Sequence, residues 1–140
     1  SKDRIIDSDE FQDEFEDNLL WWQNPEIVNE FVGSINPDIV HVLGLNLPLH
    51  FRWLKHDIPE STKLLAEHNG EKTWAQKNLW LQQFGLRIVD GFIFKSIVEA
   101  KSWIKCSAIL KRQPVYEAIE NSDSYLENLT NVYMNFNKVS

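Results

Sequence analysis

The sequence predicts an all-α fold, a compact single-domain bundle of seven or eight helices, several of them short. Apolar residues recur at spacings of three and four through most of the 140 residues, which is the period of an amphipathic helix. Strict alternation of apolar and polar residues, which is typical of a half-buried strand, is hard to find over four or more residues. Helix start and stop signals divide the chain into short stretches. We therefore expect a flexible segment at 1–8 and one helical domain at 9–140.

The first predicted helix lies near residues 9–22, and Ser8 can cap it. Its apolar side chains are spaced by four, four and three residues, so they share one face, and acids fill the other. Acids in the first turns also suit the positive end of the helix dipole. The apolar positions are Phe11, Phe15, Leu19 and Trp22.

Two Asn-Pro pairs predict the starts of two further short helices. The pairs are Asn24-Pro25 and Asn36-Pro37, each followed by an acid and two β-branched residues. Asparagine is a good N-cap, and proline suits the first helical position. Gly33 and Gly44 are the expected ends of these helices, since glycine favours a left-handed cap.

The remaining elements are also predicted to be helical. We expect a short helix that holds Phe51 and Leu54, one from Ile58 to the Asn69-Gly70 pair, and a long helical stretch from Thr73 that breaks at 85–91. A central helix near 90–111 is apolar over most of its circumference. The last two are a short helix from Pro114 to Glu120 and a final helix that opens at a Ser124/Glu127 capping box.

Composition limits the class of protein. The formal net charge is −7, and a single cysteine, Cys106, excludes an internal disulfide framework. No apolar run approaches the ~20 residues of a membrane span, and no signal peptide opens the chain. We expect a soluble, cytoplasmic protein.

The charge is unevenly distributed. Residues 1–17 contain eight acids and two bases, whereas residues 52–112 contain eleven bases and six acids. The chain thus combines an acidic arm with a basic middle. The acidic total and the lack of interleaved aromatic and basic residues argue against nucleic acid as a partner.

Motifs for catalysis or cofactor binding are not found. The four histidines lack the spacing of a zinc site, and no nucleophile elbow or glycine-rich phosphate loop is present. Cys106 lies within an apolar stretch and is expected in the core. The sequence therefore predicts no catalytic residue, no cofactor and no metal.

Candidate partner-binding residues come from tryptophans and bases. Trp21 and Trp22 are consecutive, so one helix cannot bury both on one face, and one of them is a candidate surface anchor. A basic face is expected on the central helix and just beyond it, and it suits an acidic protein or the chain's own acidic arm. Its residues are Lys101, Lys105, Lys111 and Arg112.

One stretch resembles a known family. An apolar row over Leu79–Ile88, with the Gly85-Leu86 pair, continues to Ile93, Ile97 and later to Tyr116 and Ile119. This stretch, about 79–120, resembles the type III secretion sorting-platform accessory proteins of the SctK family. The resemblance implies an all-helical, non-enzymatic cytosolic adaptor that links the inner-membrane ring to the rest of the platform.

These observations leave three functional hypotheses. The first is a non-enzymatic helical protein that binds a protein partner, such as the secretion adaptor. The second is a small acidic inhibitor or immunity protein that occludes a basic site on its partner through residues 7–17. The third is an enzyme whose site is assembled from dispersed residues, which requires a histidine that meets a carboxylate or Cys106. The oligomeric state is not predicted.

Overall fold

The computed structural model has an α/β fold with a four-stranded parallel sheet, so the all-α prediction is wrong. It describes residues 23–118 and 130–134. The strands are β1 (Ile39–Leu43), β2 (Lys63–Glu67), β3 (Gly91–Phe94) and β4 (Val115–Glu117), and they lie in the order β1-β2-β3-β4. The helices are α2 (Pro25–Ile35), α3 (Pro48–Asp57), α4 (Gln76–Leu86) and α5 (Ile97–Lys105).

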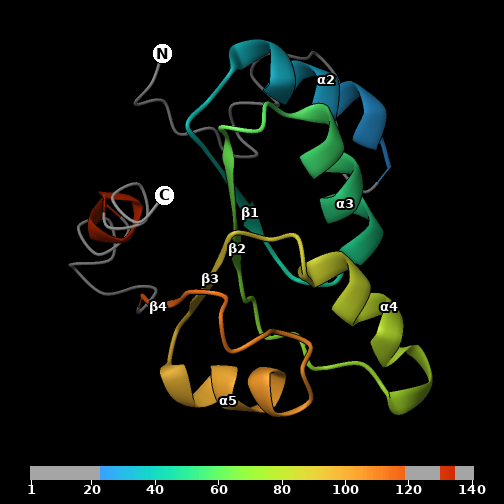
Figure 1. Ribbon diagram of the computed structural model, residues 1–140, viewed down its shortest axis with the longest axis vertical. Coiled ribbons are helices and arrows are strands. Elements are labelled where there is room, and N and C mark those ends of the chain that lie inside the picture. Colours follow the sequence, from blue (N-terminus) through green and yellow to red (C-terminus); the bar gives the residue numbers. More distant parts are fainter. Residues whose placement is uncertain (1–22, 119–129, 135–140) are drawn as a thin grey trace.

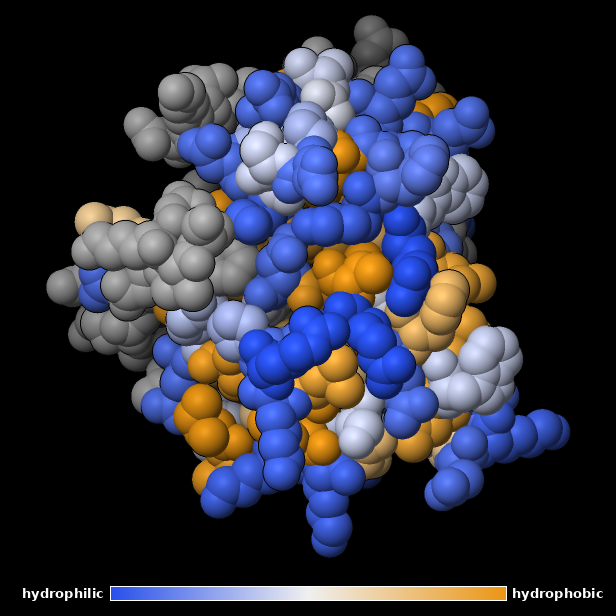
Figure 2. All heavy atoms as spheres, viewed as in Figure 1, coloured by the Kyte–Doolittle hydropathy of each residue, from blue (hydrophilic) through white to orange (hydrophobic). Residues whose placement is uncertain are grey.

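One helix connects each strand to the next, because parallel neighbours require a crossover. Helices α3, α4 and α5 follow β1, β2 and β3 in turn. In Figure 1, α3 and α4 lie on one side of the sheet and the helical residues 130–134 lie on the other. Apolar residues also reach the surface on the side of α3 and α4 (Figure 2). No helix in the described part of the chain is long and apolar enough to cross a membrane.

The strands bury apolar side chains on both faces of the sheet. Ala66 and Phe92 pack with residues of the helices in the larger core cluster. Leu65 and Ile93, which alternate with them, belong to a second cluster that includes Tyr133. We call these the helix face and the second face. Strands buried on two faces are apolar at every position, so their sequences do not alternate and are easily mistaken for helix.

Several predicted helices are replaced by strands for this reason. The helices expected after Asn36-Pro37, after Ile58 and after Pro114 are instead β1, β2 and β4. The central helix near 90–111 is divided into β3 and α5. The interruption predicted at 85–91 is present, because α4 ends at Leu86 and β3 begins at Gly91. The all-helical fold implied for 79–120 is accordingly not found.

The two Asn-Pro pairs have different roles. Pro25 begins α2, as predicted, after Asn24 at the N-cap. Asn36 instead ends the same helix with a left-handed φ of 54°, and its N–H donates to Gly33 O. Gly33 therefore lies inside α2 and does not end it. Gly44 has φ +112° and follows β1, where only glycine adopts the required backbone without strain.

Three predicted helices and the predicted segment at 1–8 fall partly or wholly outside the described residues. The segment at 1–8 and the helix at 9–22 lie outside them, as do residues 119–120 of the helix predicted after Pro114. Of the final helix, residues 130–134 are described and are helical.

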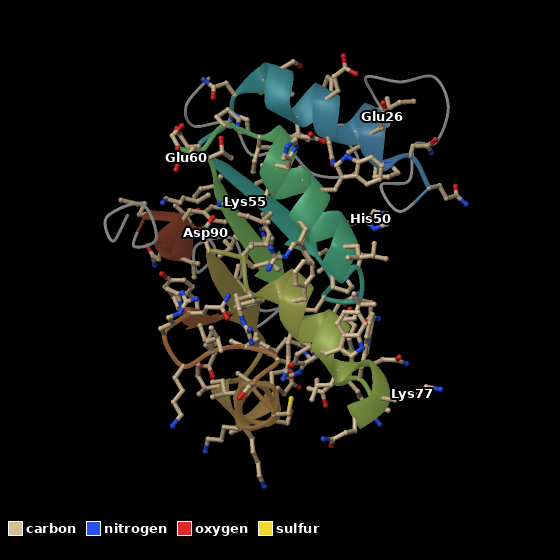
Figure 3. All side chains as sticks on the ribbon, turned by 45° about the vertical axis from the view of Figure 1, so that its right-hand side comes forward. Glu26, His50, Lys55, Glu60, Lys77 and Asp90 are labelled. Carbon is tan, nitrogen blue, oxygen red and sulfur yellow. The ribbon has the colours of Figure 1, made fainter. Side chains whose placement is uncertain are left out.

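The amino ends of the strands form one edge of the sheet, here called the amino edge, and its polar groups are joined to one another. Asp90 exchanges two hydrogen bonds with Leu64: its N–H donates to Leu64 O, and its carboxylate accepts from Leu64 N–H. The Lys55 ammonium of α3 pairs with the same carboxylate, and the two side chains point toward one another in Figure 3.

Gln113 holds the approach to β4 at this edge. Its buried amide Nε2 donates to Leu86 O at 2.9 Å, to Val89 O at 3.0 Å and to Arg87 O at 3.3 Å. Its Oε1 accepts from Leu110 N–H at 2.8 Å. One side chain thus satisfies backbone groups from two connections of the sheet.

Candidate ligand site at the carboxyl edge of the sheet

The carboxyl ends of the four parallel strands meet at the opposite edge, here called the carboxyl edge. In open parallel sheets, ligands bind in the space outside these carboxyl ends. The first residue after each strand is Gly44, His68, Lys95 or Ala118. His68 is the residue of this set with an imidazole and is almost fully buried, with 6% of its surface exposed.

Aromatic rings hold the imidazole of His68 on the helix face. It stacks on Phe94, the last residue of β3, with ring centroids 4.8 Å apart and planes 23° from parallel. The Trp103 ring of α5 makes a T-shaped contact with it, with ring centroids 5.7 Å apart. The position and plane of the imidazole are therefore fixed by the pairing of β2 with β3 and by the crossing of α5.

The hydrogen bond at Nε2 determines which nitrogen of His68 carries the proton. Nε2 lies 2.6 Å from the backbone oxygen of Glu71, and a carbonyl oxygen can only accept. Nε2 is thus the N–H donor, and in the neutral imidazole the lone pair is on Nδ1.

Nδ1 of His68 faces a carboxylate. Glu99 Oε2 lies 3.4 Å from His68 Nδ1, within ion-pair distance. The two atoms are not aligned as a hydrogen bond, and within the described residues Nδ1 has no hydrogen-bond partner. Glu99 is about half exposed (47% for the side chain), so the pair spans the boundary between core and solvent. Buried polar atoms without a partner are rare and often have a functional role.

The loop after β2 shapes the edge beside His68. Gly70 has φ +82°, which permits the turn, and the Asn69 N–H donates to Glu71 Oε1 at 2.9 Å. A Cβ added at Gly44 would lie 3.5 Å from Glu71 Oε2. The carboxylate of Glu71 therefore lies between the ends of β1 and β2.

The N-terminus of α5 is occupied by groups of the protein. Ser96 Oγ accepts from Val98 N–H at 3.1 Å, and Glu117 Oε2 accepts from Ile97 N–H at 3.0 Å. A helix N-terminus is otherwise a binding site for phosphate. The carboxylate of Glu117 already supplies a negative charge at this position.

A second histidine pairs with a carboxylate on the second face. His41 Nε2 lies 2.8 Å from Glu67 Oε1, and His41 Nδ1 contacts the Tyr133 hydroxyl. Glu67 is 3% exposed. These contacts give each imidazole nitrogen a partner and attach the helical residues 130–134 to the sheet. On the same face, burial raises the pKa of the Tyr116 phenol above its ordinary value of 10.0.

The predicted partner-binding residues lie elsewhere. Trp21 and Trp22 fall outside the described residues. Lys101 and Lys105 are exposed on α5, and Lys111 and Arg112 are exposed in the connection that follows it. Cys106, expected in the core, is half-buried at the end of α5 and packs against the larger core cluster.

Sequence reasoning missed the pair His68–Glu99. The four histidines were assessed by their spacing alone, which is not that of a zinc site. The available signal was position: His68 and Asn69 follow an apolar run that forms β2. Recognition of that run as a parallel strand would have placed His68 at the carboxyl edge.

The described chain is thus an open parallel α/β domain with an imidazole–carboxylate pair at its carboxyl edge. Among the described residues, no group of three or more His, Cys, Asp and Glu side chains is arranged to hold a metal ion. No protein-family model, curated protein or solved structure matches the chain.

Proposed function

We propose that this chain binds a neutral, hydroxyl-bearing small molecule, a sugar or polyol, at the carboxyl edge of the sheet. The observation that carries the proposal is the buried Nδ1 of His68, which lacks a hydrogen-bond partner among the described residues and faces Glu99 Oε2 at 3.4 Å. In the neutral imidazole, His68 Nδ1 and Glu99 Oε2 are two acceptors that face each other, and a donor between or beside them would satisfy both.

Adjacent hydroxyls match this pair of acceptors. One hydroxyl donates to His68 Nδ1, and its neighbour on the same carbon framework donates to the Glu99 carboxylate. Hydrogen bonds to a charged acceptor are the stronger kind. A ligand with neighbouring hydroxyls thus satisfies the buried nitrogen without the need for a charged group.

The charges around the pair favour a neutral ligand over an anion. Four carboxylates belong to the carboxyl edge, against the one base, Lys95, that directly follows a strand there. They are Glu67 on the second face and Glu71, Glu99 and Glu117, of which Glu117 occupies the α5 N-terminus. A phosphate or carboxylate ligand would be repelled there. Hydroxyls, which donate to carboxylates, are accommodated.

The pair also has the chemistry of a general base. A hydroxyl that donates to Nδ1 can transfer its proton to the imidazole. Glu99 would stabilise the resulting imidazolium, while the Glu71 carbonyl keeps Nε2–H in place. This supports the hypothesis of a site assembled from dispersed residues.

NMR titration tests the proposal. D-glucose, D-mannose and myo-inositol are added separately to the full chain labelled with ¹⁵N, and the Nδ1 resonance of His68 is followed. We expect a saturable shift for at least one of them, because a hydrogen bond to the lone pair alters the shielding of that nitrogen. Inorganic phosphate and tetramethylammonium serve as the anionic and cationic comparisons, and neither should move the resonance.

Two variants and one control identify the site. Binding to the variants is followed through the backbone amide resonances, because His68→Phe lacks the reporter nitrogen. Glu99→Gln and His68→Phe should each weaken binding at least about 10-fold, the loss expected for one hydrogen bond to a charged or buried group. Glu60→Gln, an exposed acid at the opposite edge, should leave the affinity unchanged (Figure 3). The proposal would be overturned if phosphate, and none of the three sugars or polyols, moved the His68 Nδ1 resonance. It would also be overturned if all three variants bound the ligand with equal affinity.

A second candidate function is the binding of an acidic protein partner at α5. Its support is that all four predicted bases, Lys101, Lys105, Lys111 and Arg112, are exposed, with Glu99 the single acid within α5. Charge reversal at Lys101 and Lys105 should abolish capture of an acidic partner in a pull-down from native lysate, whereas His68→Phe should not affect it. Unchanged capture after charge reversal would exclude this role.

A further inference from the structure

Four large apolar side chains are exposed on α3 and α4. The exposed fractions are 53% for Leu49, 46% for Trp53, 64% for Trp80 and 45% for Phe84. Each helix contributes two residues four positions apart, so each pair lies on one stripe of its helix. We call these four residues the aromatic surface. Exposed apolar patches on this scale mark interaction sites.

The two stripes are continuous with each other. The Arg52 guanidinium of α3 lies 3.7 Å from the centroid of the Phe84 ring of α4, and Arg52 Nε donates to Phe84 O at 2.7 Å. A Cβ added at Gly85 would lie 2.1 Å from Pro48 Cβ, so the end of α4 touches the start of α3. Figure 1 shows the two helices one after the other on the same side of the sheet.

Bases lie along the aromatic surface, and within the described chain acids border it only at its Trp53 end, where Glu26, Glu30 and Asp57 line an adjoining cavity. Residues 48–56 contain no acid, and neither do residues 72–89. No carboxylate of the described chain pairs with Arg52 or Lys77. The chemistry that fits such a surface is an amphipathic helix with aromatic residues on one face and acids on the other.

The chain itself contains a segment of this chemistry. Residues 9–22 hold six acids and no base, and their apolar positions, Phe11, Phe15, Leu19 and Trp22, have helical spacing. A helix of this length extends about 21 Å. This segment lies outside the described residues.

The segment joins the described chain close to the aromatic surface. The description begins at Gln23, two residues before α2. Glu26, in the first turn of α2 (Figure 3), and Trp53 of α3 line one cavity of about 450 Å³. The described chain therefore begins near the Trp53 end of the surface.

We propose that residues 9–22 dock on the aromatic surface of α3 and α4 in the same chain. Phe11, Phe15, Leu19 and Trp22 pack on the four exposed apolar side chains, and the acids face Arg52 and Lys77. The basic face of α5 is a poorer site, because its exposed apolar residues, Ile97 and Val98, are aliphatic and Glu99 opposes an acidic segment.

Paramagnetic NMR on the full chain tests this docking. A nitroxide is attached at Gln12→Cys in a Cys106→Ser background, and the indole N–H signals of the tryptophans are compared before and after reduction of the nitroxide. We expect Trp53 and Trp80 to lose most of their intensity in the oxidised sample. Trp103, which is buried in α5, provides the internal reference and should keep its intensity.

Charge reversal supplies the matched variants. The double change Arg52→Glu and Lys77→Glu should restore the Trp53 and Trp80 signals, and added salt should do so in part. The double change Lys101→Glu and Lys105→Glu, which alters the charge of α5 by the same amount, should not restore these signals. The remaining amide spectrum reports whether each variant is folded.

Three results would overturn the proposal. Broadening of Trp103 and α5 signals would place the segment on the basic helix. In a second sample, ¹⁵N-labelled chains without nitroxide are mixed with unlabelled chains that carry it. Broadening of the Trp53 and Trp80 signals in this sample would mean that the segment docks on a second copy. Full intensity at Trp53 and Trp80 in the oxidised sample would mean that the segment does not occupy this surface.

Discussion

The polar groups at the two edges of the sheet differ in how completely the protein satisfies their hydrogen bonds. At the amino edge, the Gln113 side chain makes four hydrogen bonds to the backbone, and Asp90 exchanges two with Leu64 and pairs with Lys55. At the carboxyl edge, His68 has one nitrogen bonded to the Glu71 carbonyl and one that no described residue satisfies.

This difference separates stability from function. A saturated network holds strands and connections together, and the loss of one member leaves several groups unpaired. An unsatisfied buried acceptor costs stability, and the proposed ligand would satisfy it. Substitutions at the amino edge should therefore affect folding, and those at the carboxyl edge should affect binding.

The largest effect is expected at Gln113. Gln113→Leu removes the partner of three carbonyl groups and of the Leu110 N–H and should lower the free energy of unfolding by about 3 kcal/mol, measured by urea denaturation. Gln83→Leu, which loses a single bond to Cys106 O, is the matched control and should lose about 1 kcal/mol. Equal losses in the two variants would contradict the idea of a network at this edge.

A smaller loss is expected at Asp90. Asp90→Asn removes the ion pair with Lys55 but keeps an oxygen for the Leu64 N–H. Both side chains of the pair are about one-quarter exposed, so solvent screening limits the effect to about 1 kcal/mol. Thermal denaturation at low and high salt measures it, and an Asp90→Asn variant as stable as the parent at low salt would show that the pair contributes nothing.

At the carboxyl edge, we expect a substitution to raise the free energy of unfolding instead of lowering it. Glu99→Gln gives His68 Nδ1 an amide N–H and should raise the free energy of unfolding slightly, by about 0.5 kcal/mol, while it weakens sugar binding. The same urea experiment measures the first effect. A destabilisation of the size expected for Gln113→Leu would mean that Glu99 is a structural residue.

The smallest effect concerns Tyr116, which lies on the second face away from both edges. Burial raises its pKa, so the unfolded chain loses the phenol proton at a lower pH than the folded chain does. Stability from this group is fully present below pH 10 and is lost as the pH rises through the folded pKa. Tyr116→Phe should therefore flatten the alkaline decline in melting temperature, whereas an unchanged profile would show that Tyr116 does not titrate differently on folding.

The sequence predicted helices better than strands. The start of α2 at Pro25 and the helix that holds Phe51 and Leu54 are confirmed, because proline and an amphipathic pattern act locally. Residues 91–94 were assigned to a helix, because a short run buried on two faces carries no period of its own. Neighbouring strands supply the missing information, and they are separated by more than 20 residues in the chain.

The candidate site depends on the same long-range contacts. His68, Phe94, Glu99 and Trp103 come together because β2 pairs with β3 and α5 crosses beside them. No spacing in the sequence marks this set. The tautomer of His68 follows from one backbone oxygen, which a sequence pattern does not report.

That backbone oxygen has an evolutionary consequence. Every residue type at position 71 provides a carbonyl, so mutation of the side chain does not remove the acceptor that fixes the proton on Nε2 of His68. The side chain at position 71, in contrast, projects between the ends of β1 and β2 and is open to change. Under the proposed function, changes of this side chain would alter ligand recognition while the backbone acceptor for His68 Nε2–H stays in place.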